Sequence, residues 1–360
     1  FEITRRLVGS EMCIRDSCSK ESSLYQRKTK HSLLLVAVYV DDLLVTGTKV
    51  DDIRVFKEEM GSKFEMSDLG KLNYYLGIEV IQTKDGVMLK QERYAMKILE
   101  EAGMSECNVV HIPMEPGLKL CKGAEESTIN EREFRRNIGC LRDLIDTRPD
   151  LPQCVGVLSR YMHDPRSSHG AAMKQVLRYL KGTCSLGLFY ENNGMKELIG
   201  YSDSSYNVDP DDGKSTTGHI FYLNSCPVTW CSQKQEIVAL SSCEAEYMAA
   251  TETAKQALWL QELLEEITED GVRKTVIRID NKSAITLAKN PVFHGRSKHI
   301  HTRFYFIREC VEKGLVVVEH VAVTEQKADI LTKALGRIKF KDMRSLIGVQ
   351  DVSNGEFKLK

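Results

Sequence analysis

Four acidic residues in the second half of the chain occupy positions from which their carboxylates could bind metal ions. They are Asp203 after the apolar run LIGYS, Glu246 in an alanine-rich helical stretch, Asp280 after the apolar run TVIRI, and Asp329 in the segment EQKADILTKAL. Carboxylates from two strand ends and two helices can converge over the edge of a sheet and hold two divalent cations. An oxygen-only ligand set suits Mg²⁺ or Mn²⁺. Two such ions clamp both the attacking and the leaving oxygen when a phosphodiester bond is cleaved.

The segments around these acids predict a domain in which strands and helices alternate. We expect strands at residues 198–203, 217–223, 227–232, 276–279 and 315–320, and helices at 242–267, 281–290, 302–312 and 325–334. A three-stranded antiparallel start followed by alternating helices and strands is typical of an α/β fold. Such a fold would place Asp203 and Asp280 at the ends of strands.

The first half of the chain contains another pair of acids, Asp41 and Asp42, between two apolar runs. Two β-rich runs around a polar pair predict a hairpin with both acids at its turn. The other elements expected here are strands around the turn at 84–86, a strand at 186–190, and helices at 51–64, 91–102, 131–145, 151–162 and 169–180. The loop at residues 191–194 is the expected domain boundary.

The bulk composition excludes several classes of protein. The chain has 360 residues, of which 42% are hydrophobic and 28% charged, and its net charge of −1 means that any nucleic-acid surface must be local. Two or three domains are expected from this length. No apolar run is long enough to cross a membrane, and the polar first twenty residues do not form a signal peptide. The eleven cysteines form no CxxC pair, which favours reduced, structural cysteines.

Several motifs closely resemble one known family. The stretches GYSDSSYNVDPDDGKSTTG, SSCEAEYMAA, IDNKSAITLAKNP and EQKADILTKAL are similar to the ribonuclease H domain of copia-type LTR retrotransposon Pol proteins. Upstream, YVDDLLVTG, LNYYLGIEV, TRPDL and VLRYLKGT resemble the C-terminal part of the reverse transcriptase of the same elements. The resemblance runs from about Cys18 to Phe340, which is nearly the whole chain.

The resemblance implies an α/β (α+β) architecture with several parts. A partial reverse transcriptase palm and a helical thumb or connection would precede an RNase H-like domain with a mixed five-stranded sheet and flanking helices. The expected parts are residues 18–108 for the C-terminal part of the palm, 109–194 for the mostly helical thumb or connection, 195–336 for the RNase H domain, and 337–360 for a C-terminal tail.

The resemblance also implies roles for the four acids. Asp203, Glu246, Asp280 and Asp329 would bind two Mg²⁺ or Mn²⁺ ions, and the domain would hydrolyse the RNA strand of RNA–DNA hybrids with no small-molecule cofactor besides the metal. Glu244 competes with Glu246 for the helix position. The family motif places its metal-binding glutamate directly before Tyr-Met-Ala-Ala, which favours Glu246.

Simpler structural explanations exist for several of these residues. Asn281 after Asp280 could cap the next helix, and acids such as Glu244 and Asp329 are favourable in a first helical turn because of the helix dipole. Some related RNase H domains use a mobile histidine for proton handling, and His320 is the nearest candidate here. An ordinary strand-end residue is the simpler reading of His320.

A basic stretch, HGRSKHIHTRFYFIREC, could contact the phosphate backbone of a nucleic acid. The residues expected to do so are Arg296, Lys298, Arg303 and Arg308. Contacts of this kind position a nucleic acid without reading its sequence. A solvated helix face is the alternative reading.

The YVDD sequence resembles the palm hairpin of reverse transcriptases, in which paired acids such as Asp41 and Asp42 bind metal. Nucleotide addition also needs a carboxylate from an earlier palm strand, and the matching family segment lies before the start of this sequence. We therefore expect reverse transcription from the full-length parent and not from this chain. The expected partners in the full element are its protease and integrase, and the expected location is a cytoplasmic virus-like particle; no membrane partner and no secretion are expected.

The first seventeen residues stand apart from the resemblance. The string VGSEMCIRDS at Val8–Ser17 looks like a translated sequencing adapter, so residues 1–17 are expected to be a non-native leader. Together with the incomplete palm, this leader supports an alternative hypothesis, in which the chain is a catalytically dead, truncated retroelement copy that at most binds nucleic acid. The intact acids favour an active RNase H. A domesticated host RNase H is disfavoured by the attached reverse transcriptase sequence.

Overall fold

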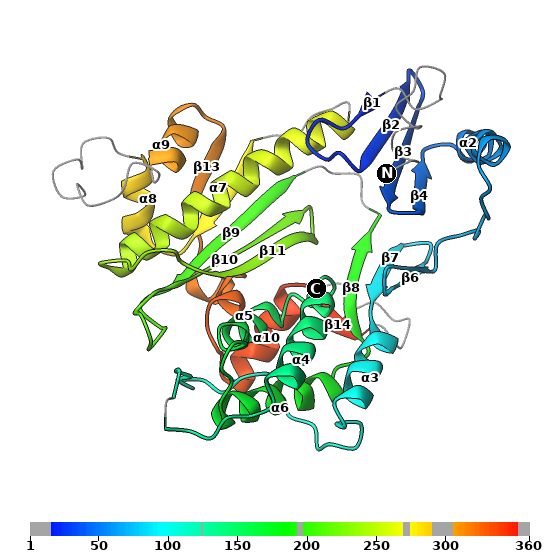
Figure 1. The fold of residues 1–360 in the computed structure, drawn as a ribbon. Helices are drawn as coiled ribbons and strands as arrows, with labels where there is room; N and C mark the ends of the chain where they lie inside the picture. The colour runs from blue at the N-terminus through cyan, green and yellow to red at the C-terminus, as the bar shows by residue number, and fades with distance from the viewer. Residues whose placement is uncertain (1–15, 124, 193–196, 269–273, 290–304, 352–360) are drawn as a thin grey trace. The chain divides into compact units, whose positions relative to one another are not determined.

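The computed structural model describes residues 16–123, 125–192, 197–268, 274–289 and 305–351 (Figure 1). The chain forms two compact units, one from residues 1–72 and 258–272 and the other from residues 73–257 and 273–360. The expected palm segment, 18–108, is thus divided between the two units. No helix within the described ranges is long and apolar enough to span a membrane.

The first unit contains a four-stranded antiparallel sheet, a helix that follows it, and the helical residues 258–267. Its strands are β1 (Asp16–Ser17), β2 (Leu24–Thr29), β3 (Ser32–Tyr39) and β4 (Asp42–Gly47), in that order in the sheet, followed by α2 (Val50–Lys63). Buried residues alternate along β3, as expected for a strand with one covered face. Phe56 and Met60, one helical turn apart on α2, pack into the same core.

The hairpin predicted in the first unit is confirmed, because Tyr39 of β3 pairs with Asp42 of β4 around a two-residue turn. Asp41 lies in that turn as expected, whereas Asp42 is already the first residue of β4. The expected leader is only partly covered. Residues 1–15 lie outside the described residues, whereas Asp16 and Ser17 form β1 and pair with β2, so the ordered sheet begins before the expected boundary.

The second unit contains the mixed five-stranded sheet that the resemblance implied. The sheet order is β11-β10-β9-β12-β13, with bounds Cys226–Lys234, Thr216–Leu223, Leu198–Ser205, Thr275–Ile279 and Val316–His320. Strands β9, β10 and β11 are antiparallel, and β12 runs parallel to both β9 and β13. Helix α7 (Ser242–Ile267) follows β11, and α8 (Lys282–Lys289) and α9 (Tyr305–Glu312) lie between β12 and β13 in the sequence. This is the mixed α/β arrangement that the resemblance implied.

A second sheet and a group of helices complete this unit. The sheet order is β14-β8-β7-β6-β5, with bounds Val349–Asp351, Leu186–Glu191, Gly86–Lys90, Ile78–Gln82 and Tyr74–Tyr75. The helices are α3 (Glu92–Glu101), α4 (Glu131–Leu144), α5 (Pro152–Ser159), α6 (Ser167–Lys181) and α10 (Arg337–Leu346). One hydrophobic core joins these helices to the mixed sheet that contains β9 and β10, since Leu141 and Leu158 belong to the same cluster as Tyr201 and Ile220.

The segment after Gly336 differs from the expected tail. Residues 337–346 form α10, whose Phe340 and Met343 are buried, and residues 349–351 form β14, which pairs with β8. The mixed charge of this segment concealed a short amphipathic helix. The expected division at residues 191–194 likewise falls inside one compact unit, and residues 193–196 lie outside the described ones.

A buried histidine makes the second unit sensitive to acid. His219 of β10 is 8% exposed, and its Nδ1 has no hydrogen-bond partner within the part of the chain that the structure describes. Burial lowers its pKa from 6.5 to about 4. The folded state therefore binds fewer protons than the unfolded state between these values, and stability falls as the pH falls from 6.5 to 4.

We expect this proton linkage to cost about 3 kcal/mol of unfolding free energy by pH 4, because one pKa unit corresponds to about 1.4 kcal/mol. Urea unfolding at a series of pH values should show that His219→Gln flattens the profile between pH 4 and 6.5. His163→Gln, at a histidine whose side chain is 97% exposed, is the matched control. A profile that is unchanged in His219→Gln would contradict the assignment.

Candidate metal centre

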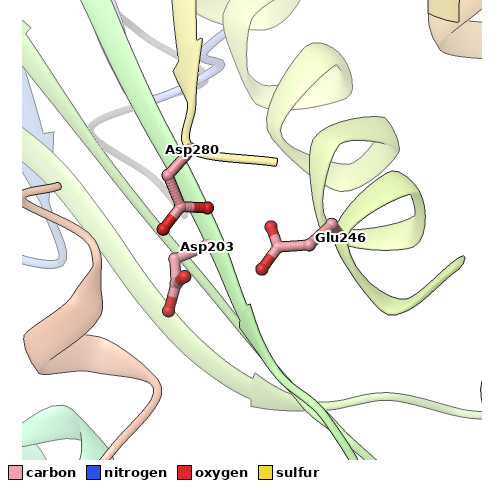
Figure 2. A group of neighbouring side chains, drawn as sticks. All are labelled: Asp203, Glu246 and Asp280. Atoms are coloured by element: carbon pink, nitrogen blue, oxygen red, sulfur yellow. The ribbon is translucent and has the colours of Figure 1, made fainter. Parts of the chain in front are cut away.

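Three of the four predicted acids meet at one place in the second unit. Asp203 lies on β9, Asp280 follows the last residue of the neighbouring strand β12, and Glu246 lies on α7. One carboxylate oxygen from each lies within 4.8 Å of the others. Figure 2 shows the carboxylates of Asp203 and Asp280 beside each other, with Glu246 pointing toward them from its helix. Asp203 was expected to end its strand, but β9 continues to Ser205, which pairs with Thr216 of β10.

Burial disfavours the charged forms of the acids in this group. Asp203 is 0% and Glu246 6% exposed, while Asp280 is half-buried. Burial, followed by the charges of Asp203 and Asp280, raises the pKa of Glu246 to about 9. Burial also raises the pKa of Asp203 and of Asp280. Burial therefore outweighs the nearby charge of Lys333, which alone would lower these pKa values. The open side of the group is that of Asp280.

An unsatisfied oxygen indicates what would bind in this group. Glu246 Oε1 accepts a hydrogen bond from the Ser204 amide at 3.2 Å. Glu246 Oε2 is buried and has no hydrogen-bond partner among the described residues. A buried carboxylate oxygen without a donor costs free energy unless a cation reaches it. Three carboxylates converge, and one of them has an oxygen that accepts no hydrogen bond from the described residues. This arrangement fits a hard divalent cation such as Mg²⁺ or Mn²⁺.

The structure also separates the two glutamates that competed in the sequence. Glu244 Oε2 accepts a hydrogen bond from the Leu240 amide at 2.8 Å, and the Glu244 amide donates to Ser241 Oγ at 3.1 Å. These contacts surround the N-terminus of α7, where an acid and a serine are favourable. Glu244 thus stabilises the N-terminus of α7, and Glu246 is the glutamate that faces the two aspartates.

Asp329 has a different environment from the other three acids. It begins η4 (Asp329–Leu331), a 3₁₀ turn that, with η3 (Val323–Glu325), replaces the helix expected at 325–334. Asp329 is 1% exposed, and Lys333 Nζ lies 2.7 Å from its Oδ1. Lys339 forms an ion pair with its Oδ2. Asp329 is consequently neutralised by two lysines and stands outside the group of three.

Three residues that sequence reasoning missed hold the acids in place. Thr332 Oγ1 donates a hydrogen bond to Asp203 Oδ2, and Lys333 Nζ lies 3.3 Å from Asp203 Oδ1. Burial would lower the pKa of Lys333, but the charges of Asp203 and Asp329 outweigh it and keep that pKa above its ordinary value. The spacing of four residues from Asp329 to Lys333 could have signalled this pair. The contact of Lys339 with Asp329 has no local signature.

A glycine allows η4 to approach the sheet. Gly218 of β10 pairs with Asp203 of β9, and a Cβ at this position would lie 2.6 Å from Thr332 Cγ2 and 2.9 Å from Leu331 Cβ. A side chain there would push η4, with Thr332 on it, away from Asp203. Overpacking of this kind typically costs 1–3 kcal/mol.

We therefore expect Gly218→Ala to lower the unfolding free energy by about 2 kcal/mol and to weaken metal binding, measured by urea unfolding and Mn²⁺ titration. Gly139→Ala on α4 is the matched control, because nothing lies within 4 Å of a Cβ there. Alanine in an exposed helix interior should stabilise by about 0.5–1 kcal/mol. Equal effects of the two substitutions would contradict the steric argument.

The remaining predicted residues lie elsewhere. Asp41 and Asp42 are exposed at the β3–β4 turn, and the metal-ligating group found within the described ranges does not include them. His320 is exposed at the end of β13, opposite Ile279. Arg308 of α9 is 6% exposed, and its guanidinium donates to the Leu287 carbonyl at 3.2 Å, while its role in binding a nucleic acid stays a prediction. The other predicted phosphate-binding residues, Arg296, Lys298 and Arg303, lie outside the described residues.

Comparisons with known proteins assign the chain to a family. Residues 11–116 match the family described as reverse transcriptase (RNA-dependent DNA polymerase). The chain is 38% identical to the retrovirus-related Pol polyprotein from transposon RE1 of Arabidopsis thaliana, over 92% of its own length and 23% of that polyprotein. It is 32% identical to a putative transposon Ty5-1 protein of Saccharomyces cerevisiae, over 66% of its own length and 78% of that protein.

Among solved structures, the RNase H1 from the archaeon Halobacterium salinarum aligns with 38% of this chain and 94% of its own length, at 15% identity and a TM-score of 0.25. The chain spans about a quarter of the length of the first curated relatives that it matches. The extent of the similarity to transposon polyproteins shows that this chain belongs to the copia-type retrotransposon Pol proteins.

Proposed function

We propose that this chain hydrolyses the RNA strand of RNA–DNA hybrids by two-metal catalysis, with Asp203, Glu246 and Asp280 as ligands of a divalent cation. The observation that carries the proposal is the buried Oε2 of Glu246, which has no hydrogen-bond partner among the described residues, on a carboxylate that lies beside two further acids. Converging carboxylate oxygens of this kind suit Mg²⁺ or Mn²⁺. Asp329 is proposed as the fourth ligand, because it lies beside Asp203 through their shared contact with Lys333.

The protein's own groups hold the carboxylates in defined orientations. The Ser204 amide orients Glu246, Thr332 orients Asp203, and the end of β12 carries Asp280 to the solvent side of the group. When bound, two divalent ions stabilise the developing charge on the attacking and leaving oxygens of a phosphodiester. Because Asp203 and Glu246 are buried and Asp280 is half-exposed, a substrate phosphate would approach from the side of Asp280.

The wider roles of the full polyprotein remain proposals for this chain. In the complete element the YVDD hairpin would serve reverse transcription, and the RNase H activity proposed here would remove the RNA template. The protease and integrase of the same polyprotein would be its partners, in a cytoplasmic virus-like particle. None of these roles is needed for hydrolysis at the acid group.

The test is cleavage of a labelled RNA–DNA hybrid by the full chain in Mg²⁺, beside RNA and DNA duplexes of the same sequence. We expect only the RNA strand of the hybrid to be cut, and Asp203→Asn to abolish the cleavage. Asp212→Asn is a matched control, since Asp212 lies in a loop and pairs with Lys234 at 2.9 Å. No cleavage by folded wild-type protein, in Mg²⁺ or Mn²⁺, would instead favour the catalytically dead copy.

A further inference from the structure

A lysine ammonium occupies the space between two of the proposed metal ligands. Lys333 Nζ lies 2.7 Å from Asp329 Oδ1 and 3.3 Å from each carboxylate oxygen of Asp203. Asp203 and Asp329 are 0% and 1% exposed, whereas the side chain of Lys333 is 40% exposed. The ammonium therefore enters the acid group from its solvent side and neutralises two buried carboxylates.

A divalent ion between Asp203 and Asp329 would need the position that this ammonium occupies. Mg²⁺ binds carboxylate oxygens at about 2.0–2.1 Å, so it would use the same oxygens from the same direction. Two cations a few ångströms apart also repel strongly in a site with little water. An ion held by Asp203, Glu246 and Asp280 is different, because it needs one oxygen of Asp203 and leaves Asp329 with Lys333.

We infer that Lys333 is an internal cation that competes with the second metal ion at the Asp203–Asp329 position. The inference rests on the proposed function, since it concerns the same acid group. In the free protein, Asp203, Glu246 and Asp280 take up one divalent ion, and Lys333 supplies the positive charge on the other side of Asp203. The second ion binds when the Lys333 side chain moves away, which its solvent-exposed position allows.

Lys339 provides a matched comparison. It also forms an ion pair with Asp329, through Oδ2, and its side chain is 45% exposed, close to the 40% of Lys333. Lys333 bridges two carboxylates, whereas the ion pair of Lys339 within the described residues is with Asp329 alone. Removing either lysine changes the net charge by the same amount. Only removal of Lys333 vacates the space between Asp203 and Asp329.

The experiment counts Mn²⁺ ions bound to the metal-free full chain, by calorimetry and by the electron paramagnetic resonance signal of unbound Mn²⁺. We expect one ion for wild type and for Lys339→Met, and two for Lys333→Met and Lys333→Gln. Adding Asp203→Asn to Lys333→Met should remove both ions, because Asp203 serves both positions. Circular dichroism confirms folding, and the glutamine variant serves if the methionine variant does not fold.

Equal ion counts in wild type and the Lys333 variants would overturn the inference, as would a second ion that persists in the Asp203→Asn double variant or that also arises in Lys339→Met. Ion binding does not require hydrolysis. If the wild type cleaves no hybrid but the Lys333 variants still gain an ion, the proposed function fails while the competition stands. If cleavage occurs and the ion count does not change, the competition fails alone.

Discussion

Glu246→Gln is expected to abolish hybrid cleavage and, at the same time, to stabilise the metal-free protein. The two effects have one cause, which is a buried carboxylate whose Oε2 has no donor among the described residues. Glutamine removes the negative charge while it keeps the size and an oxygen that can accept from the Ser204 amide. Charge stabilisation by a bound metal is worth several kcal/mol, and each 1.4 kcal/mol is a factor of ten, so a loss of about 10³-fold or more is expected.

The stabilising effect follows from proton linkage. Glu246 has a folded-state pKa of about 9 against an ordinary value of 4.5. Between these values the folded state holds a proton that the unfolded state has lost, so stability falls as the pH rises from 4.5 to 9. At pH 8 the glutamine variant should therefore unfold at higher urea, with a gain on the order of 3 kcal/mol in EDTA.

Addition of Mg²⁺ should reverse the order of stability. The cation binds the folded wild type and not the unfolded chain, which stabilises the folded state by mass action, whereas the variant gains little. Glu252→Gln, on an exposed part of α7 with an ion pair to Lys255, is the matched control and should change neither cleavage nor stability by more than about 0.5 kcal/mol. A glutamine variant that is less stable than wild type in EDTA at pH 8 would refute the idea that burial opposes ionisation of Glu246 in the folded state.

The elements that carry Asp203, Glu246 and Asp280 could be predicted from the sequence because each has a strong local pattern. The long helix was expected at residues 242–267 and is found as Ser242–Ile267. The apolar runs before Asp203 and Asp280 predicted strands. Parallel pairing of β12 with β9 places the two acids side by side, toward the same end of the two strands. Local periodicity was sufficient here, because the position of each acid along its strand follows from the apolar run before it and does not depend on tertiary packing.

The environment of Asp329 could not be predicted in the same way. A helix was expected at 325–334, but η4 is a 3₁₀ turn, whose Asp329 carbonyl accepts from Thr332 Oγ1 at 3.1 Å while the same hydroxyl also contacts Asp203. That contact joins residues far apart in the chain. The ion pair with Lys339 depends on how α10 packs, and the sequence after Gly336 was expected to be a tail.

The boundary between parts was also beyond local reasoning. A polar loop at 191–194 suggested that a separate domain starts near residue 195. Trp230 of β11, however, donates a hydrogen bond to the Ile145 carbonyl at 2.9 Å, across that boundary. Two neighbouring segments share a hydrophobic core only if their apolar faces pack against each other. Hydrophobic periodicity shows which face of an element is apolar, but it does not show which other face packs against it.

The TRPDL motif contains an ion pair whose loss should destabilise the second unit strongly. Arg148 and Asp150 are 1% and 2% exposed, and two parallel hydrogen bonds of 2.9 and 2.7 Å join the guanidinium to the carboxylate. Arg148 also donates to the Thr183 carbonyl at 2.8 Å, and Tyr179 donates to Asp150 at 2.6 Å. Arg344 of α10 reaches the Tyr179 hydroxyl at 3.0 Å, so the pair connects α10 with α6.

Arg148→Met is expected to lower the unfolding free energy of this unit by about 3–5 kcal/mol, because Asp150 would remain buried with its main partner removed. The pair itself is a smaller source of stability, since the desolvation of two charges offsets much of their attraction. The double variant Arg148→Met/Asp150→Leu should therefore recover most of the loss. This recovery distinguishes the cost of an unpaired charge from the loss of a favourable contact.

The measurement is urea unfolding followed by the fluorescence of Trp230 in a Trp259→Phe background, because the chain has two tryptophans and Trp230 lies in the second unit. Lys97→Ala is the control, since Lys97 pairs with Glu101 on the surface of α3 with side chains 68% and 42% exposed. That variant should shift stability by less than about 0.5 kcal/mol. A double variant as unstable as Arg148→Met would mean that the guanidinium contributes mainly through its bonds to Thr183, in which case the network stabilises the junction of α6 with β8 more than it neutralises Asp150.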